Sequence, residues 1–121
     1  SNTCLGCHGP NGISEGPAIP TISGMSEIYI IGAMLAYKYE NNEDKIEEII
    51  AADIDFEDVE YFARTSTVMN RIAKGYSEPE IKAIAKHFAS LPFEGQEQNT
   101  DIEQAKAGAR IHENHCEKCH Y

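Results

Sequence analysis

Two copies of one cysteine and histidine pattern stand near the two ends of the chain. The first is Cys4-Leu-Gly-Cys7-His8, and the second is Cys116-Glu-Lys-Cys119-His120. Together they use every cysteine of the 121-residue sequence. In both copies two residues separate the two thiols and an imidazole follows directly, so the chemistry to be explained is that of a C-x-x-C-H pattern.

This pattern is the attachment signature of c-type haem. The two thiols reach the vinyl groups of the porphyrin as thioethers, and the adjacent histidine is aimed at the iron. We therefore predict haem attachment at Cys4, Cys7, Cys116 and Cys119, with His8 and His120 as iron ligands. Thioether formation takes place outside the cytoplasm, so a periplasmic protein is expected.

Three other chemistries use paired cysteines. A zinc ribbon places its two pairs about 15–20 residues apart, whereas 108 residues separate Cys7 from Cys116. A thioredoxin-like redox pair stands within a strand-helix-strand pattern, and the residues around Cys4 do not form a strand pattern. Structural disulfides would leave His8 and His120 without a role. A zinc-bearing or metal-free module therefore stays only as an alternative.

The second axial ligand decides what a bound haem can do, and the candidates are methionine and histidine. Met25 and Met34 lie in or next to a predicted helix, where methionine usually fills the core. Met69 stands apart, in ARTSTVMNRIAKGYS, so the chain has room to wrap the haem and return on its far side. We expect Met69 to be this ligand. His87 is the alternative, although a lone helical histidine more often packs or faces solvent.

Two segments predict the helices that would position these residues. Over about residues 26–39, the apolar positions recur at helical spacing: Ile28, Ile31, Met34 and Leu35. Further on, Ser77 and Glu80 form a capping box with Pro79 in the first turn. The apolar stripe that follows ends before Pro92 and consists of Ile81, Ile84, Ala85, Phe88 and Ala89.

Half of the acidic residues gather at positions 40–60 between these two helices, and Lys45 is the only basic residue within that stretch. They are Glu40, Glu43, Asp44, Glu47, Glu48, Asp53, Asp55, Glu57, Asp58 and Glu60. The same segment predicts short amphipathic helices packed on the domain, through Ile46, Ile49, Ile50, Phe56, Val59, Tyr61 and Phe62. The acidic residues form either a solvated face or a docking surface for a basic partner.

Composition sets limits on the class of protein. A hydrophobic share of 41% with 25% charged residues is typical of a folded globular chain. The formal charge of −10 disfavours nucleic acid and anionic lipid headgroups as partners. The longest apolar run, from Tyr29 to Tyr37, is less than half the roughly 20 residues that a membrane span needs. Ser1 to Cys4 leaves no room for a signal peptide, so we expect that any export signal has been removed.

The second motif follows what resembles the start of another domain. Residues 92–100 have the proline, glycine and polar content of a linker. Thr100 and Glu103 predict a second capping box, and the helix after it carries Ile102, Ala105, Ala109 and His112 on one face. We predict one domain over 1–91 with an acidic insert at about 40–64, a linker over 92–100 and a truncated second domain over 101–121. Alternatively, residues 101–115 fold back to replace a helix missing before Cys4.

Several strings carry a family resemblance. CLGCHGPNG, GPAIP, the Met69 segment and the capped helix resemble class I cytochromes c of the two-domain kind. STVMNRIAKGYS and AKAGARIHENHCEKCH are similar to the di-haem cytochrome subunit of flavocytochrome c sulfide dehydrogenase, with the cytochrome c4 type as the broader match. The resemblance implies an all-α, haem-wrapping fold, followed by the opening helix and haem motif of a second such domain. It leads us to expect a fragment of a longer di-haem protein.

The resemblance also assigns roles. His8 would be the proximal ligand and Met69 the distal one, and the carbonyl of Pro20 would accept a hydrogen bond from the proximal histidine, which would fix the ring and raise its basicity. Pro20 is otherwise a loop breaker. Compared with the sulfide dehydrogenase subunit, about twenty extra residues lie between Tyr39 and Thr65, and they contain the acidic cluster.

The expected function is one-electron transfer, with no catalysis by the chain itself. The resemblance implies a flavoprotein partner that oxidises sulfide and passes electrons to this subunit. The first alternative is an independent cytochrome c4-like shuttle to a terminal oxidase. The second is a haem peroxidase or sensor with an open site, which would require that Met69 does not bind the iron.

Overall fold

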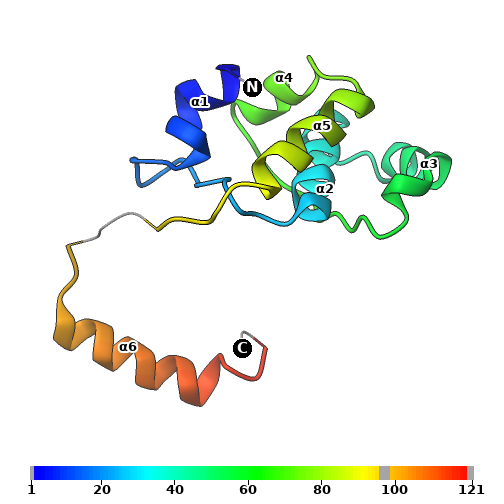
Figure 1. Ribbon diagram of the computed structural model, residues 1–121. Helices are drawn as coiled ribbons and strands as arrows, with labels where there is room; N and C mark the ends of the chain where they lie inside the picture. Colours follow the sequence, from blue (N-terminus) through cyan, green and yellow to red (C-terminus); the bar gives the residue numbers. More distant parts are fainter. Residues whose placement is uncertain (1, 96–98, 120–121) are drawn as a thin grey trace.

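The computed structural model describes residues 2–95 and 99–119, and within these ranges the chain forms helices and no β-strand. In chain order they are α1 (Asn2–His8), η1 (Pro10–Gly12), α2 (Glu27–Lys38), α3 (Glu43–Ala52), η2 (Ile54–Phe56), α4 (Met69–Ala73), α5 (Glu78–Ala89) and α6 (Ile102–His115). None of these helices is long and apolar enough to cross a membrane. The prediction of an all-α fold is confirmed (Figure 1).

Helix α2 is the centre of the core, because both α4 and α5 pack against it (Figure 1). The helix predicted over 26–39 is therefore confirmed, and Met34 is a core residue as expected. Ile28 shares the helical spacing of Ile31 and Leu35, yet it is 44% exposed, while Ile30 is buried. Both residues lie in the first turn of α2, so the turn buries one side and leaves the side of Ile28 exposed.

Helix α5 begins and ends as its sequence predicts. The capping box is present, with Glu80 accepting hydrogen bonds from both the backbone N–H and the hydroxyl of Ser77 at 2.8 and 2.9 Å. Ile81, Ala85 and Phe88 face the core and are completely buried. His87 is exposed beside this stripe. The apolar spacing of α5 therefore decides which face packs on α2.

The acidic insert folds into α3 and η2 and packs on the domain. Its buried side chains are Ile46, Phe56 and Val59, which confirms the predicted amphipathic packing. Phe62 is the exception, because 64% of it is exposed. Lys82 of α5 anchors the insert, with its Nζ 2.9 Å from the carboxylate of Asp53 and 2.7 Å from that of Asp55.

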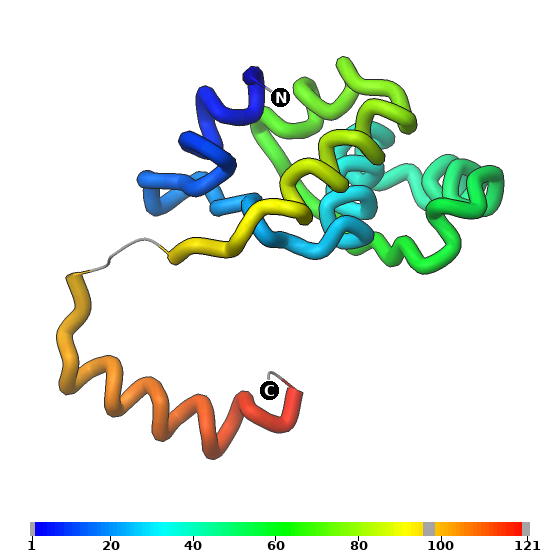
Figure 2. The backbone as a smooth tube through the Cα atoms, viewed as in Figure 1, coloured from blue at the N-terminus to red at the C-terminus, as the bar shows by residue number. Residues whose placement is uncertain are grey.

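The insert returns to the domain across α2 at a glycine. A Cβ atom on Gly32 would lie 2.1 Å from the carbonyl oxygen of Glu60, so only glycine permits this approach of the two backbones. Figure 2 shows the chain running from α3 back past α2 and on to α4. The close approach fixes where the chain leaves the insert and turns toward Met69.

Helix α6 is present, but its N-cap differs from the predicted one. The carboxylate of Asp101, rather than the hydroxyl of Thr100, accepts the N–H groups of Glu103 and Gln104 at 2.9 and 3.1 Å. Asp101 is the N-cap because it directly precedes the first helical residue and its negative charge is stabilised at a helix N-terminus.

No residue of α6 is buried, and the helix stands apart from the other helices in Figures 1 and 2. The alternative in which residues 101–115 replace a helix of the first domain is therefore not the arrangement found.

Candidate functional site

Helix α1 places the first cysteine pair and its histidine together. Cys4, Cys7 and His8 are three and four residues apart within α1, so they share one face of the helix. Cys4 is half-buried against the hydrophobic core, whereas Cys7 is exposed. All four cysteines of the chain are free thiols in the structure rather than disulfides. One helical turn thus presents two thiols and an imidazole to the same side.

His8 is oriented by a single hydrogen bond. Its side chain is 8% exposed, and its Nδ1 lies 2.7 Å from the carbonyl oxygen of Pro20. A carbonyl can only accept, so Nδ1 carries the hydrogen and Nε2 of the neutral ring keeps its lone pair. A metal-bound histidine typically donates its other N–H to such an acceptor. The Nε2 atom is therefore left available to an iron.

The loop that carries Pro20 is held by hydrogen bonds to the turn after α1. Gly12 has φ of 81°, and a Cβ there would lie 2.9 Å from side-chain atoms of Ile22 and Phe88. The carbonyl of Gly12 accepts the N–H of Ile22 at 2.8 Å, and the hydroxyl of Thr21 accepts the N–H of Ser14 at 3.1 Å. Because these bonds hold the two residues that directly follow Pro20, its carbonyl has a defined position beside His8.

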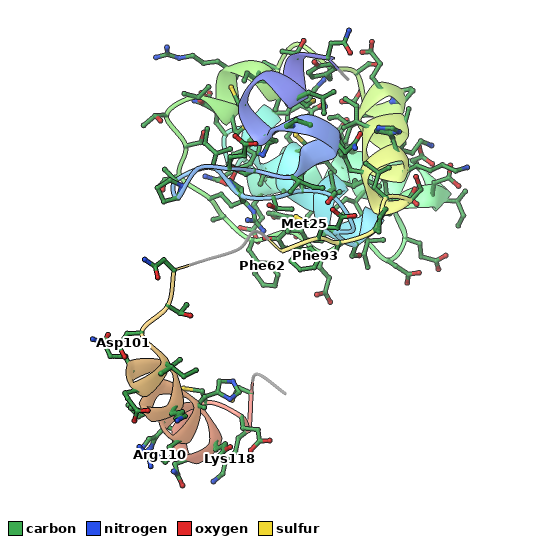
Figure 3. All side chains as sticks on the ribbon, turned by 60° about the vertical axis from the view of Figure 1, so that its left-hand side comes forward. Met25, Phe62, Phe93, Asp101, Arg110 and Lys118 are labelled. Carbon is green, nitrogen blue, oxygen red and sulfur yellow. The ribbon has the colours of Figure 1, made fainter. Side chains whose placement is uncertain are left out.

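Met69 is the first residue of α4 and is half-buried against the same core as Cys4. The hydroxyl of Ser66 accepts the N–H groups of Val68 and Asn70 at 3.2 and 3.4 Å, which shapes the turn before α4. Figures 1 and 3 both show α1 and α4 next to each other at one end of the domain. The fold thus brings the helix of the first motif and the helix of the predicted distal ligand to the same region.

Two residues that the sequence did not single out hold the segment before Met69. Asn41 accepts the backbone N–H of Arg64 at 2.9 Å and donates to its carbonyl oxygen at 2.8 Å. The Arg64 guanidinium lies 4.8 Å from the ring centroid of Tyr29 and donates to its hydroxyl. The sequence pattern does not predict this pairing, because Asn41 and Arg64 are 23 positions apart.

The end of α2 and the start of α5 are joined by a polar contact. The hydroxyl of Tyr39 donates to the carboxylate of Glu78, and Lys38 lies 3.5 Å from the same carboxylate. Burial, followed by the bond to Glu78, raises the pKa of Tyr39 from 10.0 to about 12. The hydrogen bond from Tyr39 is the main cause that lowers the pKa of Glu78. This contact positions α5 relative to α2, next to α4.

The second motif lies at the end of the described chain. The backbone N–H of Cys116 bonds to the carbonyl of His112 at 2.8 Å, and that of Cys119 bonds to Cys116 at 3.0 Å. His112 and His115 are exposed. His120, the predicted iron ligand of this motif, lies outside the described residues.

A zinc site would need several ligands converging on one point. Among residues 2–95 and 99–119, no group of three or more histidine, cysteine, aspartate or glutamate side chains is placed to hold a metal ion. A c-type haem needs a different arrangement, in which the thiols bind the porphyrin and only the imidazole reaches the iron. The free thiols of α1 and the Nδ1 bond of His8 fit that group, with Cys4, Cys7, His8, Met69 and Pro20 as its predicted contacts.

Comparison with known proteins agrees with this chemistry. Over 91 residues the chain is 37% identical to the "cytochrome subunit of sulfide dehydrogenase" of Chlorobaculum tepidum. The aligned region covers 75% of this chain and 62% of that protein. Over 88 residues it is 24% identical to the "thiosulfate dehydrogenase electron acceptor" of Stutzerimonas stutzeri, covering 73% of this chain and 32% of that protein. The chain thus spans less than two thirds of the length of either relative.

The family comparison covers the part of the chain that contains the first motif and Met69. The family model described as cytochrome c matches residues 1–92. This range also contains the loop of Pro20 and helix α5. The chain therefore belongs to the cytochrome c family, whose cofactor is haem c.

Proposed function

We propose that this chain transfers single electrons through a haem c attached to α1. The observation that carries the proposal is the 2.7 Å hydrogen bond from His8 to Pro20, made by a histidine that directly follows a C-x-x-C pair. When bound, the haem supplies an iron that changes its charge by one. The chain is thus a carrier and not itself an enzyme.

Each residue of the site has a defined task in this proposal. Cys4 and Cys7 bind the porphyrin covalently, and His8 supplies a nitrogen ligand whose ring is oriented by Pro20. Met69 would offer its thioether sulfur to the iron, and this soft ligand would favour the reduced state. With both positions filled, little has to rearrange when the charge changes, and no substrate has to bind the iron.

The electron donor in this proposal is a dehydrogenase subunit. The names of the two relatives support it, since one is a subunit of sulfide dehydrogenase and the other an acceptor for thiosulfate dehydrogenase. We favour a flavoprotein that oxidises sulfide, because that relative is the more similar in sequence. An independent shuttle of the cytochrome c4 type is the alternative. Covalent attachment of haem outside the cytoplasm supports a periplasmic location.

A second haem on Cys116, Cys119 and His120 belongs to the same proposal. The residues before this motif form α6, which has no buried residue in the described chain. A helix with Ile102 and Ile111 exposed at 63% and 59% has an apolar surface that further chain can cover. This supports α6 as the opening helix of a second domain, after a linker over 92–100.

Intact mass spectrometry of the protein matured in a periplasm tests the proposal. Each attached haem adds one fixed mass, so the spectrum counts haems directly, and two are expected. A mass equal to the bare polypeptide, or to a zinc adduct, would contradict electron transfer by haem. In the optical spectrum, rapid binding of cyanide or carbon monoxide would instead indicate a peroxidase or sensor with an open site.

A further inference from the structure

The acidic insert contains a groove that the proposed electron transfer does not use. The groove has a volume of about 510 Å³ and lies between α3 and the chain that follows η2. Ile50 and Ala51 line it from α3, and Tyr61 and Phe62 line it from the returning chain. Phe62 is 64% exposed and projects from the edge of the domain in Figure 3. An apolar groove with an exposed aromatic residue is typical of an interaction site.

The rim of this groove is negatively charged. Glu47 and Glu60 line it directly. Burial, and then the nearby carboxylates of Glu43, Glu47 and Asp44, raise the pKa of Tyr61 inside the groove. The Tyr61 ring thus lies in the field of acidic residues from α3. A cation brought to this rim would be attracted, and an anion would be repelled.

The acidic residues of the insert fall into two groups. Those that fix the insert are already paired with lysines: Glu40 with Lys74, Glu48 with Lys45, and Asp53 and Asp55 with Lys82. The other group has no ion-pair partner within the described chain and is exposed, and it consists of Glu43, Asp44, Glu47, Glu57, Asp58 and Glu60. The ion pairs therefore do not neutralise this second group, which includes the two residues at the groove rim, Glu47 and Glu60.

We infer that this groove docks a basic segment of a partner protein, which inserts one apolar side chain between lysine or arginine residues. The apolar floor would bury the inserted side chain, and Glu47 and Glu60 would face the flanking cations. A second copy of this chain does not fit as the occupant, since each copy carries a formal charge of −10. Helix α6 does not fit either, because its acidic and basic residues are mixed. The inference does not depend on the haem.

A designed peptide tests the docking on the full-length haem-loaded protein. The probe is a fluorescein-labelled helical peptide of lysine and alanine with one central leucine, measured by fluorescence anisotropy at low and at physiological salt. A twin peptide has alanine in place of the leucine, and another has glutamate in place of the lysines. The leucine peptide should bind about tenfold or more tightly than its alanine twin, because only the leucine is buried in the groove. The glutamate peptide should not bind.

Variants of the groove separate docking from simple charge attraction. Ala51→Trp fills the groove and should weaken binding of the leucine peptide to the level of its alanine twin. Phe62→Ser removes one wall at an exposed position and serves as a second variant if Ala51→Trp folds poorly. Glu47→Lys with Glu60→Lys should weaken binding about tenfold or more at low salt.

The matched control is Glu94→Lys with Glu113→Lys, which changes the net charge equally at exposed positions before and in α6. This control should keep the affinity for the leucine peptide within about threefold of the wild-type value, well below the tenfold loss expected for the groove variant. An equal loss in the control and the groove variant would overturn the inference. So would equal binding of the leucine and alanine peptides, or no binding of either to the wild-type protein.

Discussion

The Nδ1–H of His8 donates a hydrogen bond of 2.7 Å to the carbonyl oxygen of Pro20, twelve residues further along the chain. A histidine that donates from Nδ1 is the more basic at Nε2, so it stabilises the more positively charged state of an iron bound there. The length of this bond is set by the loop between α1 and α2 rather than by either residue alone. The loop is therefore a means of setting the reduction potential.

Pro20→Ala should raise the reduction potential by about 20–40 mV. Alanine keeps the carbonyl but frees the backbone, which weakens a hydrogen bond worth about 1 kcal/mol, and 59 mV corresponds to about 1.4 kcal/mol for one electron. Potentiometric titration of the haem-loaded protein measures the change. Pro17→Ala, in the same loop and exposed, is the control. An equal shift in both variants would mean that loop flexibility, and not the bond to His8, is responsible.

Met69→Ala should leave the haem attached but remove its second axial ligand. The weak charge-transfer band from sulfur to iron, at the red end of the oxidised spectrum, should disappear, and cyanide should bind rapidly. Met34→Leu is the control, because this volume-conserving change in the core costs less than about 1.5 kcal/mol and should keep the band. If the spectrum of Met69→Ala matched that of the wild type, Met69 would not be the ligand.

Tyr39→Phe should destabilise the fold by about 1 kcal/mol at neutral pH, because Glu78 loses a hydrogen bond at a partly exposed position. The pKa of Tyr39 is raised in the folded protein to about 12 from 10.0. A raised pKa contributes stability that is complete below pH 10 and is lost as the pH rises toward 12.

The difference in unfolding free energy between wild type and Tyr39→Phe should therefore be constant below pH 10 and shrink above it. Urea unfolding across this range measures the difference. Tyr37→Phe, in the last turn of α2, provides a control that leaves the bond between Tyr39 and Glu78 in place. A difference that stays constant up to pH 12 would disprove the contribution of the Tyr39 hydroxyl.

Gly32→Ala should destabilise the domain by about 1–3 kcal/mol, since the new Cβ would lie 2.1 Å from the carbonyl oxygen of Glu60 and the returning chain would have to move. Gly108→Ala is the control on α6, where no atom lies within 4 Å of the added Cβ. Alanine is the better helix former there by up to about 1 kcal/mol, so helicity should stay equal or rise. Unfolding midpoints for Gly32→Ala at or above the wild-type value would contradict the close approach.

Asp101→Ala should reduce the helicity of α6, because the N–H groups of Glu103 and Gln104 lose their acceptor. The loss of such an N-cap costs about 1 kcal/mol. Far-ultraviolet circular dichroism of a peptide covering residues 99–119 measures the change. Thr100→Ala should have little effect on helicity. If Thr100→Ala lowered the helicity more than Asp101→Ala, Thr100 would be the cap.

Local spacing was enough to predict the parts of the molecule whose contacts lie within one or two helical turns. The C-x-x-C-H pattern gave the motif on α1, and the Ser77 and Glu80 pair gave the start of α5, because the bonding groups are neighbours in the chain. The apolar spacing of Ile81, Ala85 and Phe88 likewise specified a buried face. In α6, where two neighbouring residues competed for the cap, spacing alone favoured the wrong one.

The sequence by itself thus determined the C-x-x-C-H motif on α1, the all-α class and the amphipathic insert. Only the tertiary structure decided that the backbones of Gly32 and Glu60 approach closely, that Asn41 forms hydrogen bonds with the backbone of Arg64, and that Ile28 is exposed. These contacts join residues far apart in the chain, so their geometry depends on how α2, α4 and α5 pack together. The groove beside Phe62 has the same origin, because its two walls are separate segments that meet only when the insert folds back onto α2.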